Sequence, residues 1–280
     1  MNFATSKTMR IAQQLYEGVD VKGSGTVGII TYLRTDSTRI SEEADANVRS
    51  YIGEQYGSQY VAAEGARKSG SQKIQDAHEA IRPTDVTRTP AMLKDSLSRD
   101  QFRLYQLIWK RFVASRMMPA VYETTSVKIA AGKYRFNVAT SKIAFEGFRL
   151  IYTEAGEEKD EKGVLLKGLD ENSELSLEQF DSKQHFTQPP AHYTEASLVK
   201  TLEELGIGRP STYAPTITLI INRRYVAKEN KNLYMTELGE VVNNINDAFI
   251  PKYCGCQFYS KYGKSSGRCC GRKSQMEDDY

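Results

Sequence analysis

The sequence has 280 residues, and its hydrophobic content of 40% and charged content of 26% are ordinary for a soluble globular protein. This length allows one large domain or two to three small ones. No apolar run approaches the ~20 residues of a membrane span and the N-terminus lacks a signal-peptide layout, which predicts a cytoplasmic protein. The net charge of +3 is too small to indicate nucleic-acid binding, so any basic surface must be local.

The first predicted helix begins at Thr5 or Ser6, either of which can cap it, and ends before Gly18. A glycine-rich loop follows it. Residues 28–31 are then apolar and β-branched, which predicts a short strand that leads into Tyr32.

Tyr32 and Arg34 would share one face of such a strand, because residues i and i+2 point the same way. A guanidinium binds phosphate oxygens in a planar fork and stabilises developing negative charge. A free tyrosine has a pKa near ~10, so its phenol needs such help to attack at neutral pH. The pair is a candidate nucleophile and helper for a phosphodiester, although the segment alone favours a simple surface tyrosine.

Ser41, followed by two acidic residues, predicts the start of a second helix. Small polar residues over 65–73 predict a surface loop. Beyond this loop, His78 can donate to a phosphate or shuttle a proton near neutral pH. Arg82 precedes a proline, which favours an extended or turn backbone.

Residues 100–118 have helical periodicity with a stripe of aromatic side chains. We interpret this stripe as a packed core face rather than a surface for base stacking. Residues 121–152 alternate instead, which predicts strands separated by turns at 131–133 and 146–147. An acidic loop at 154–161 interrupts this pattern, and strand-like sequence continues to Phe186.

The region 193–250 predicts a winged helix-turn-helix. Thr194 caps one helix, which ends at Gly206, and Ser211 or Thr212 starts the next, followed by short strands at 225–226 and 233–235. Free amides at the start of the second helix, the Thr212 hydroxyl and Arg209 all suit an anion. An ordinary capped helical hairpin with solvated arginines explains the same residues equally well.

Three segments carry a resemblance to a known family. They are Ile30-Thr-Tyr-Leu-Arg-Thr-Asp-Ser37, Ala77-His-Glu-Ala-Ile-Arg-Pro-Thr84, and Tyr193-Thr-Glu-Ala-Ser-Leu-Val-Lys200 running into Gly206-Ile-Gly-Arg-Pro-Ser-Thr-Tyr213. In this order they resemble the type IA DNA topoisomerases, bacterial topoisomerase I in particular. The resemblance covers about residues 1–251.

The resemblance implies a multidomain α+β fold that forms part of the toroid of these enzymes. Residues 1–118 would be a helical domain with the catalytic tyrosine, 119–190 part of a β-rich hinge or arch domain, and 191–251 part of a winged-helix-like domain. The implied reaction begins when Tyr32 attacks single-stranded DNA and forms a 5′-phosphotyrosine. Another strand passes through the gap and the bond is resealed, which relaxes negative supercoils without ATP.

The resemblance also implies roles for individual residues. Tyr32 and Arg34 are the catalytic pair, with Arg34 on the nonbridging oxygens and lowering the pKa of the phenol. Asp36 would orient Arg34 through a charge-assisted hydrogen bond. The implied DNA-binding residues are Thr31, Asp36, His78, Arg82, Arg209, Thr212 and Arg223.

In this family a Toprim domain supplies clustered carboxylates that hold Mg²⁺, and no such Asp-x-Asp cluster occurs in this sequence. We therefore expect a fragment without metal ligands of its own, inactive when isolated. Its partners would be single-stranded DNA and a separate Toprim-containing chain, with no membrane, in the cytoplasm with the nucleoid. The rival predictions are a non-catalytic single-stranded DNA-binding remnant and a truncated, non-functional reading frame.

Residues 252–280 diverge from the family and hold all four cysteines, so the body of the chain has no disulfide framework. The adjacent pair Cys269 and Cys270 does not suit a tetrahedral zinc site, and the usual Cys-x-x-Cys knuckle is missing. Translated one nucleotide out of register, residues 258–274 can encode a string similar to the family's own continuation. We therefore predict a frameshifted, disordered tail, which resequencing of the coding DNA would test.

Overall fold

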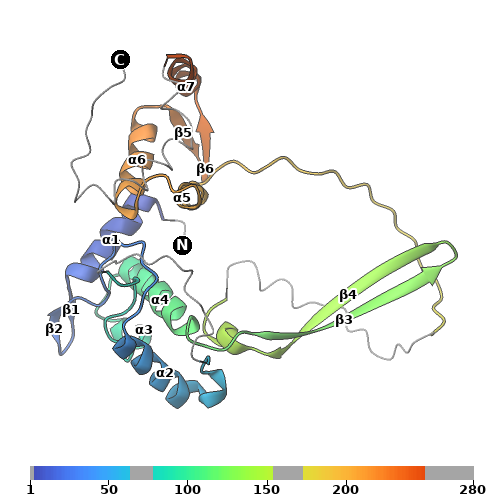
Figure 1. Cartoon of the computed structure of the whole chain (residues 1–280), viewed down its shortest axis with the longest axis horizontal. Helices are drawn as coiled ribbons and strands as arrows, with labels where there is room; N and C mark the ends of the chain where they lie inside the picture. Colours follow the sequence, from blue (N-terminus) through green and yellow to red (C-terminus); the bar gives the residue numbers. More distant parts are fainter. Residues whose placement is uncertain (1–2, 64–77, 154–172, 250–280) are drawn as a thin grey trace, which may run out of the picture.

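The structure is a computed structural model that describes residues 3–63, 78–153 and 173–249. Its helices and strands form an α+β fold, as expected. Figure 1 shows a helical unit, a long hairpin that projects from it, and a smaller unit at the N-terminal end of α1. The predictions for the loop at 65–73, the acidic loop at 154–161 and the tail from 252 lie outside the described residues.

The helical unit is built around one apolar core. It contains α1 (Thr5–Glu17), β1 (Val19–Val21), β2 (Gly25–Val27), α2 (Glu42–Tyr56), the 3₁₀ turn η1 (Ser58–Tyr60), α3 (Pro90–Leu93) and α4 (Arg99–Ala114). The strands β1 and β2 pair antiparallel, with Val19 opposite Val27. Fully buried side chains come from α1, α2, α4 and the chain after β2, among them Leu15, Val48, Tyr105 and Ile29.

The aromatic stripe of α4 is a core face, as predicted. Tyr105 and Trp109 are buried, and each gives its polar atom to a backbone carbonyl: the Tyr105 hydroxyl donates to Arg88 O (2.7 Å) and Trp109 Nε1 to Val86 O (2.9 Å). These bonds satisfy the polar groups that burial would otherwise leave unpaired. They also attach the segment that follows Thr84 to the core.

The start of α1 differs from the prediction. Neither Thr5 nor Ser6 caps the helix: Ala4 is the N-cap residue and Thr5 is the first helical residue. The amide of Thr5 instead donates to the carboxylate of Glu195, 190 residues away in the chain (N to Oε2, 2.7 Å). The cap of α1 is therefore a tertiary contact.

The projecting hairpin consists of β3 (Val121–Ala131) and β4 (Tyr134–Phe145), joined by a turn in which Gly132 has φ 59°. The sequence predicted a larger set of strands. In the described residues this region holds these two strands, Phe148 lies in the 3₁₀ turn η2 (Gly147–Leu150), and residues 173–186 form no strand. An alternating sequence pattern indicates strands with residues exposed on two faces, but it does not determine how many strands form.

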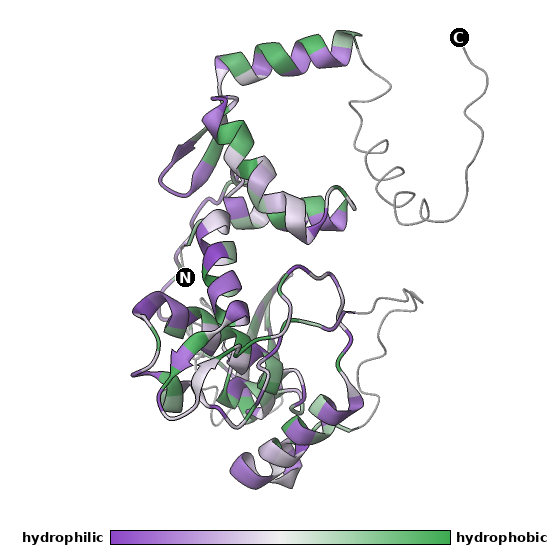
Figure 2. Ribbon diagram, turned by 90° about the vertical axis from the view of Figure 1, so that its left-hand side faces the viewer, coloured by the Kyte–Doolittle hydropathy of each residue, from purple (hydrophilic) through white to green (hydrophobic). Residues whose placement is uncertain are grey.

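The second unit has the predicted order of elements: α5 (Glu195–Glu204), α6 (Pro210–Asn222), β5 (Val226–Glu229) and β6 (Asn232–Met235). The two strands form an antiparallel hairpin. Thr194 caps α5 in a capping box with Ser197, as expected. A further helix, α7 (Glu237–Phe249), was not predicted, and the upper part of Figure 2 shows its hydrophobic and hydrophilic faces.

None of the helices in the described ranges is long and apolar enough to span a lipid bilayer.

Candidate functional site

The first motif, Ile30–Ser37, and the described part of the second, residues 78–84, lie side by side in the fold. The amide of Thr31 donates to Arg82 O (2.9 Å), and the amide of Thr84 donates to Ile29 O (3.1 Å). This pairing is antiparallel, and it replaces the strand predicted over 28–31 by a single bridge between Ile30 and Pro83. The two motifs therefore form one structural element around Tyr32.

Thr31 fastens this element. Its hydroxyl donates to Ala80 O (2.8 Å) and accepts from the amide of Arg82 (2.9 Å). Both bonds go to the backbone of the second motif, so in this structure the hydroxyl positions the segment. The role of Thr31 as a DNA contact stays a prediction beside this positioning role.

The ring of Tyr32 lies between two other rings. The His78 ring stacks on it at 5.1 Å between centroids and 25° between planes, and the Tyr16 ring meets it edge-on at 5.5 Å and 72°. Tyr32 is half-buried, and His78 is exposed. Such aromatic pairs fix ring orientation and contribute about 0.5–1.5 kcal/mol each. The predicted nucleophile and the predicted phosphate-contact histidine are therefore neighbours.

Tyr16 lies in the last turn of α1, and its 39% exposed side chain contacts Tyr32. The end of α1 that carries it also holds the tyrosine segment directly. The amide of Ile29 donates to Leu15 O (2.9 Å), and a Cβ at Gly28 would lie 2.4 Å from Tyr16 O. The glycine permits this close approach, a signal that sequence reasoning did not use.

The chain bends immediately after Tyr32. Leu33 and Arg34 lie in the bend, with Leu33 buried at 3% exposure and Arg34 exposed. The argument from a shared strand face is therefore wrong for Tyr32 and Arg34, because no strand continues through them. Asp36 was expected to orient Arg34, and in the structure its Oδ2 lies 4.0 Å from a guanidinium nitrogen of Arg209 in the second unit.

Arg82 is not open to a ligand in this structure. Its guanidinium contacts the Glu79 carboxylate at 2.8 Å and 2.7 Å and donates to Pro83 O at 3.0 Å, and its side chain is only 14% exposed. Burial acts to raise the pKa of Glu79, but the hydrogen bond and charge of Arg82 outweigh it and the pKa is lowered. In this structure Arg82 therefore forms an internal ion pair, and its contact with DNA stays a prediction.

At the start of α6 the capping residue is Arg209 and the first helical residue is Pro210, not Ser211 or Thr212 as predicted. The Thr212 hydroxyl accepts from the amide of Arg209 (2.9 Å) and lies 3.0 Å from its carbonyl. The hydroxyl is therefore bonded to backbone in this structure, and its contact with a phosphate stays a prediction. Proline also removes one of the amides that an anion could use.

Two arginines mark the ends of α6. Arg209 is half-exposed at its start, and Arg223 is exposed at its C-cap. A rise of about 1.5 Å per residue separates them by about 20 Å, so they cannot bind the same phosphate. Arg209, through Asp36, is the arginine of this unit that lies against the tyrosine segment.

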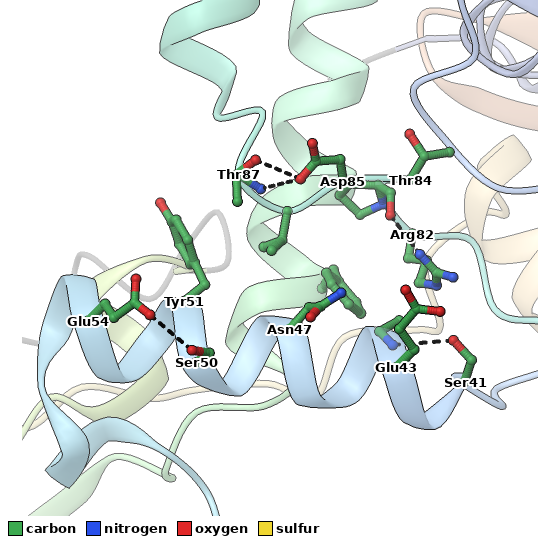
Figure 3. A pocket seen from close by; sticks show the side chains of 14 residues that line it. Ser41, Glu43, Asn47, Ser50, Tyr51, Glu54, Arg82, Thr84, Asp85 and Thr87 are labelled. Atoms are coloured by element: carbon green, nitrogen blue, oxygen red, sulfur yellow. Dashed lines mark hydrogen bonds between the residues drawn. The ribbon is translucent and has the colours of Figure 1, made fainter.

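A pocket of about 490 Å³ lies on the other side of the second motif, between α2 and residues 82–87 (Figure 3). Glu43, Glu54 and Asp85 line it, and burial raises the pKa of its Tyr51 to about 12. Three carboxylates repel a phosphate, and the arginine in the wall is paired with Glu79. The pocket therefore does not suit nucleic acid.

Comparison with known proteins shows the family of the chain. The model of the DNA topoisomerase family matches residues 1–263. The chain belongs to the bacterial type IA DNA topoisomerases. The match continues past residue 251, where the sequence resemblance was expected to end.

A solved structure of full-length topoisomerase I from Thermotoga maritima, in a monoclinic crystal form, is similar at 37% identity and a TM-score of 0.76. The alignment covers 96% of this chain and 43% of that one, so the chain spans less than half the length of this relative.

No group of three or more His, Cys, Asp or Glu side chains that could hold a metal ion is present within the described ranges.

Proposed function

We propose that this chain performs the strand-cleavage chemistry of a type IA topoisomerase, with Tyr32 as the nucleophile. The supporting observation is the placement of Tyr32: a half-buried ring between Tyr16 and His78, on a segment fastened by two backbone bonds to the second motif. A phenol held in this way loses little freedom when it meets a phosphate, which favours attack.

In the proposed step the phenol oxygen of Tyr32 bonds to phosphorus and the phosphorus–O3′ bond breaks. The phenol proton leaves, and the departing 3′ oxygen takes up a proton. The products are a 5′-phosphotyrosine and a free 3′-hydroxyl on single-stranded DNA. Attack by that hydroxyl reverses the step, so passage of another strand and resealing relax negative supercoils without ATP.

The surrounding residues divide into contacts with DNA and supports for the protein. Arg34 is exposed two residues after Tyr32 and can bind nonbridging oxygens, and the stacked His78 can donate to a phosphate. Arg209 reaches the same place from α6, while Arg223 binds the strand about 20 Å further along. Thr31 and Arg82 hold the backbone that presents Tyr32.

Mg²⁺ is the ion that the family uses to position the scissile phosphate. Because the described residues do not provide its ligands, we propose that a Toprim-containing chain supplies them in the cytoplasm, at the nucleoid. The proposed cleavage and resealing steps use this chain's own side chains.

A covalent-trapping assay tests the proposal. End-labelled single-stranded DNA is mixed with the chain and Mg²⁺, with and without a separate Toprim fragment, then denatured and resolved on a gel. We expect an adduct with the added fragment and none in Tyr32→Phe. The control Tyr60→Phe, at a tyrosine that packs on Phe145 away from the site, should keep the adduct. An adduct that persists in Tyr32→Phe would refute the assignment.

A second candidate function is single-stranded DNA binding without cleavage. The exposed arginines at the two ends of α6 favour it, because they can follow a backbone without any chemistry. Binding that weakens steeply with salt, together with no adduct under any condition of the trapping assay, would support this function.

A further inference from the structure

We propose that Glu195 is the positioning residue that sets the DNA-binding helix pair, α5 and α6, against the tyrosine site. The inference deepens the proposed function, and its catalytic readout rests on that function. The carboxylate of Glu195 joins two units that are far apart in the sequence.

The first contact of Glu195 is with α1. Its Oε2 accepts from both the amide and the hydroxyl of Thr5, at 2.7 Å and 2.8 Å. The first amides of a helix have no partner inside the helix, and the dipole concentrates positive potential there. A carboxylate at this place therefore serves as a charged cap, and α1 has no cap from its own neighbours.

The second contact of Glu195 is within its own unit. Oε1 lies 2.5 Å from Lys228 Nζ on β5, so the carboxylate joins α1, the start of α5 and the β5–β6 hairpin. The side chain of Glu195 is only 11% exposed. Such a nearly buried, fully bonded carboxylate holds its geometry more firmly than a surface ion pair.

The other end of α1, the helix that Glu195 caps, contacts the segment that carries Tyr32. Leu15 O binds the amide of Ile29, and the Tyr16 ring lies against Tyr32. With 13 residues, α1 is a rod of about 20 Å that runs from the Glu195 carboxylate to the nucleophile. Figure 1 shows α5 and α6 beside the N-terminal end of α1.

A second bridge between the same two units is weaker. Asp36 and Arg209 approach to 4.0 Å, and both side chains are about half exposed. Exposed pairs of this length contribute little, and a DNA phosphate competes well for the guanidinium. Of these two ionic contacts between the units, that of Glu195 is therefore the firmer, and Arg209 can leave Asp36 for DNA while Glu195 keeps its bonds to α1.

Two variants remove the contact from opposite sides. Glu195→Ala deletes the carboxylate. Thr5→Pro removes the amide donor and the hydroxyl, and proline is well tolerated at the first position of a helix. Lys200→Ala is the matched control, because Lys200 lies on the same helix with a 76% exposed side chain.

The distance between the units is the first readout, and it does not depend on activity. Spin labels on Asp20→Cys and Lys231→Cys, with the four native cysteines changed to serine, report it in the full chain. We expect one narrow distance distribution in the parent and in Lys200→Ala, and a severalfold broader one in both Glu195→Ala and Thr5→Pro. A distribution that stays narrow in either variant overturns the proposal.

The trapping assay with the Toprim fragment gives the second readout. We expect the rate of adduct formation at saturating DNA to fall about tenfold or more in Glu195→Ala, with a half-saturating DNA concentration within about threefold of the parent. An unchanged rate combined with broadened distances would overturn the positioning role. If the parent forms no adduct, the proposed function fails, and the distance readout still decides whether Glu195 joins the units.

Discussion

At the scale of single residues, the threonines of the three motifs fasten backbone to backbone. Thr31 bonds to Ala80 and Arg82, Thr84 donates to Gly28 O, and Thr212 bonds to Arg209. A hydroxyl of this kind gives up its hydrogen-bonding capacity to the protein. The presentation of Tyr32 therefore depends on side chains that need not touch DNA.

Replacing Thr31 by valine keeps the shape and removes the hydroxyl. We expect the free energy of unfolding to fall by about 1–3 kcal/mol, because the carbonyl of Ala80 and the amide of Arg82 both lose a partner. Urea denaturation measures this change. The exposed Thr38→Val serves as the control and should stay within about 0.5 kcal/mol of the parent.

Gly28→Ala tests the close approach between α1 and the tyrosine segment. The new Cβ would lie 2.4 Å from Tyr16 O, which is backbone and cannot rotate away. We expect a loss of about 1–3 kcal/mol in the free energy of unfolding and less adduct in the trapping assay. At Gly53 of α2 the nearest atom is 3.8 Å away, so Gly53→Ala should be neutral or stabilising, by up to about 1 kcal/mol. Equal losses at both glycines would contradict this explanation.

At the scale of elements, the sequence predicted well what depends on near neighbours. Ser41 caps α2 as expected, Thr194 caps α5, and the aromatic stripe of α4 faces the core. The sequence did not reveal contacts between residues whose partners are distant in the chain or already engaged. No spacing rule could show that Glu195 caps α1, that Glu79 occupies Arg82, or that Asp36 faces Arg209.

The predictions for the candidate site also divide into features that the sequence indicated and features that it could not show. Tyr32 and His78 are neighbours because their motifs pair, whereas the bend at Leu33 and Arg34 could not be deduced from a strand-like string. Residue type fixes what a side chain can bind, and the fold decides which partner it meets. The helix signals predicted the second unit as far as β6, but they were not used to predict α7, which comes after it.

Asp45 provides a test at this scale, because it ties α2 to the residues that follow α4. Its carboxylate bonds to Arg49 and Arg116. Burial acts to raise the pKa of Asp45, and the two arginines outweigh it, so the pKa lies below its ordinary value of 3.8. A lowered pKa means stability that is present above the unfolded value and is lost as pH falls through the folded one.

We therefore expect Asp45→Asn to lower the free energy of unfolding by about 1 kcal/mol at pH 7. The difference from the parent should shrink once the pH falls below about 4, where the parent carboxylate itself takes up a proton. Urea denaturation across this pH range measures it. A difference that stays constant with pH would show that charge is not responsible.

At the scale of the whole molecule, much apolar surface is open. Tyr134, Phe136 and Val138 lie on one face of β4 and are 63%, 48% and 36% exposed, and Phe249 at the end of α7 is 81% exposed. Surfaces of this kind are usually covered by a partner or by further chain. The Thermotoga maritima relative is more than twice as long as the part that aligns here, since that part is 43% of it. Sequence periodicity shows which face is apolar, but not what covers it.

The connection between the hairpin and α5 gives the corresponding test. Residues 173–192 have no regular structure and are exposed, and Figure 1 shows them as a long extended connection. Backbone without hydrogen bonds or burial enters a protease site without prior unfolding. We expect limited digestion with a lysine-specific protease to cut after Lys183 well before it cuts after Lys110, which lies within α4.

Mass spectrometry of the early fragments identifies the order of cutting. Lys183→Gln should remove the early fragment and leave the remaining pattern unchanged, which separates this site from the others. If the bond after Lys183 is instead as resistant as the bond after Lys110, the connection is covered in solution. Its apolar side chains Leu175, Leu177 and Phe180 would then pack on a surface such as the open face of β4, because burial of both would remove them from water together.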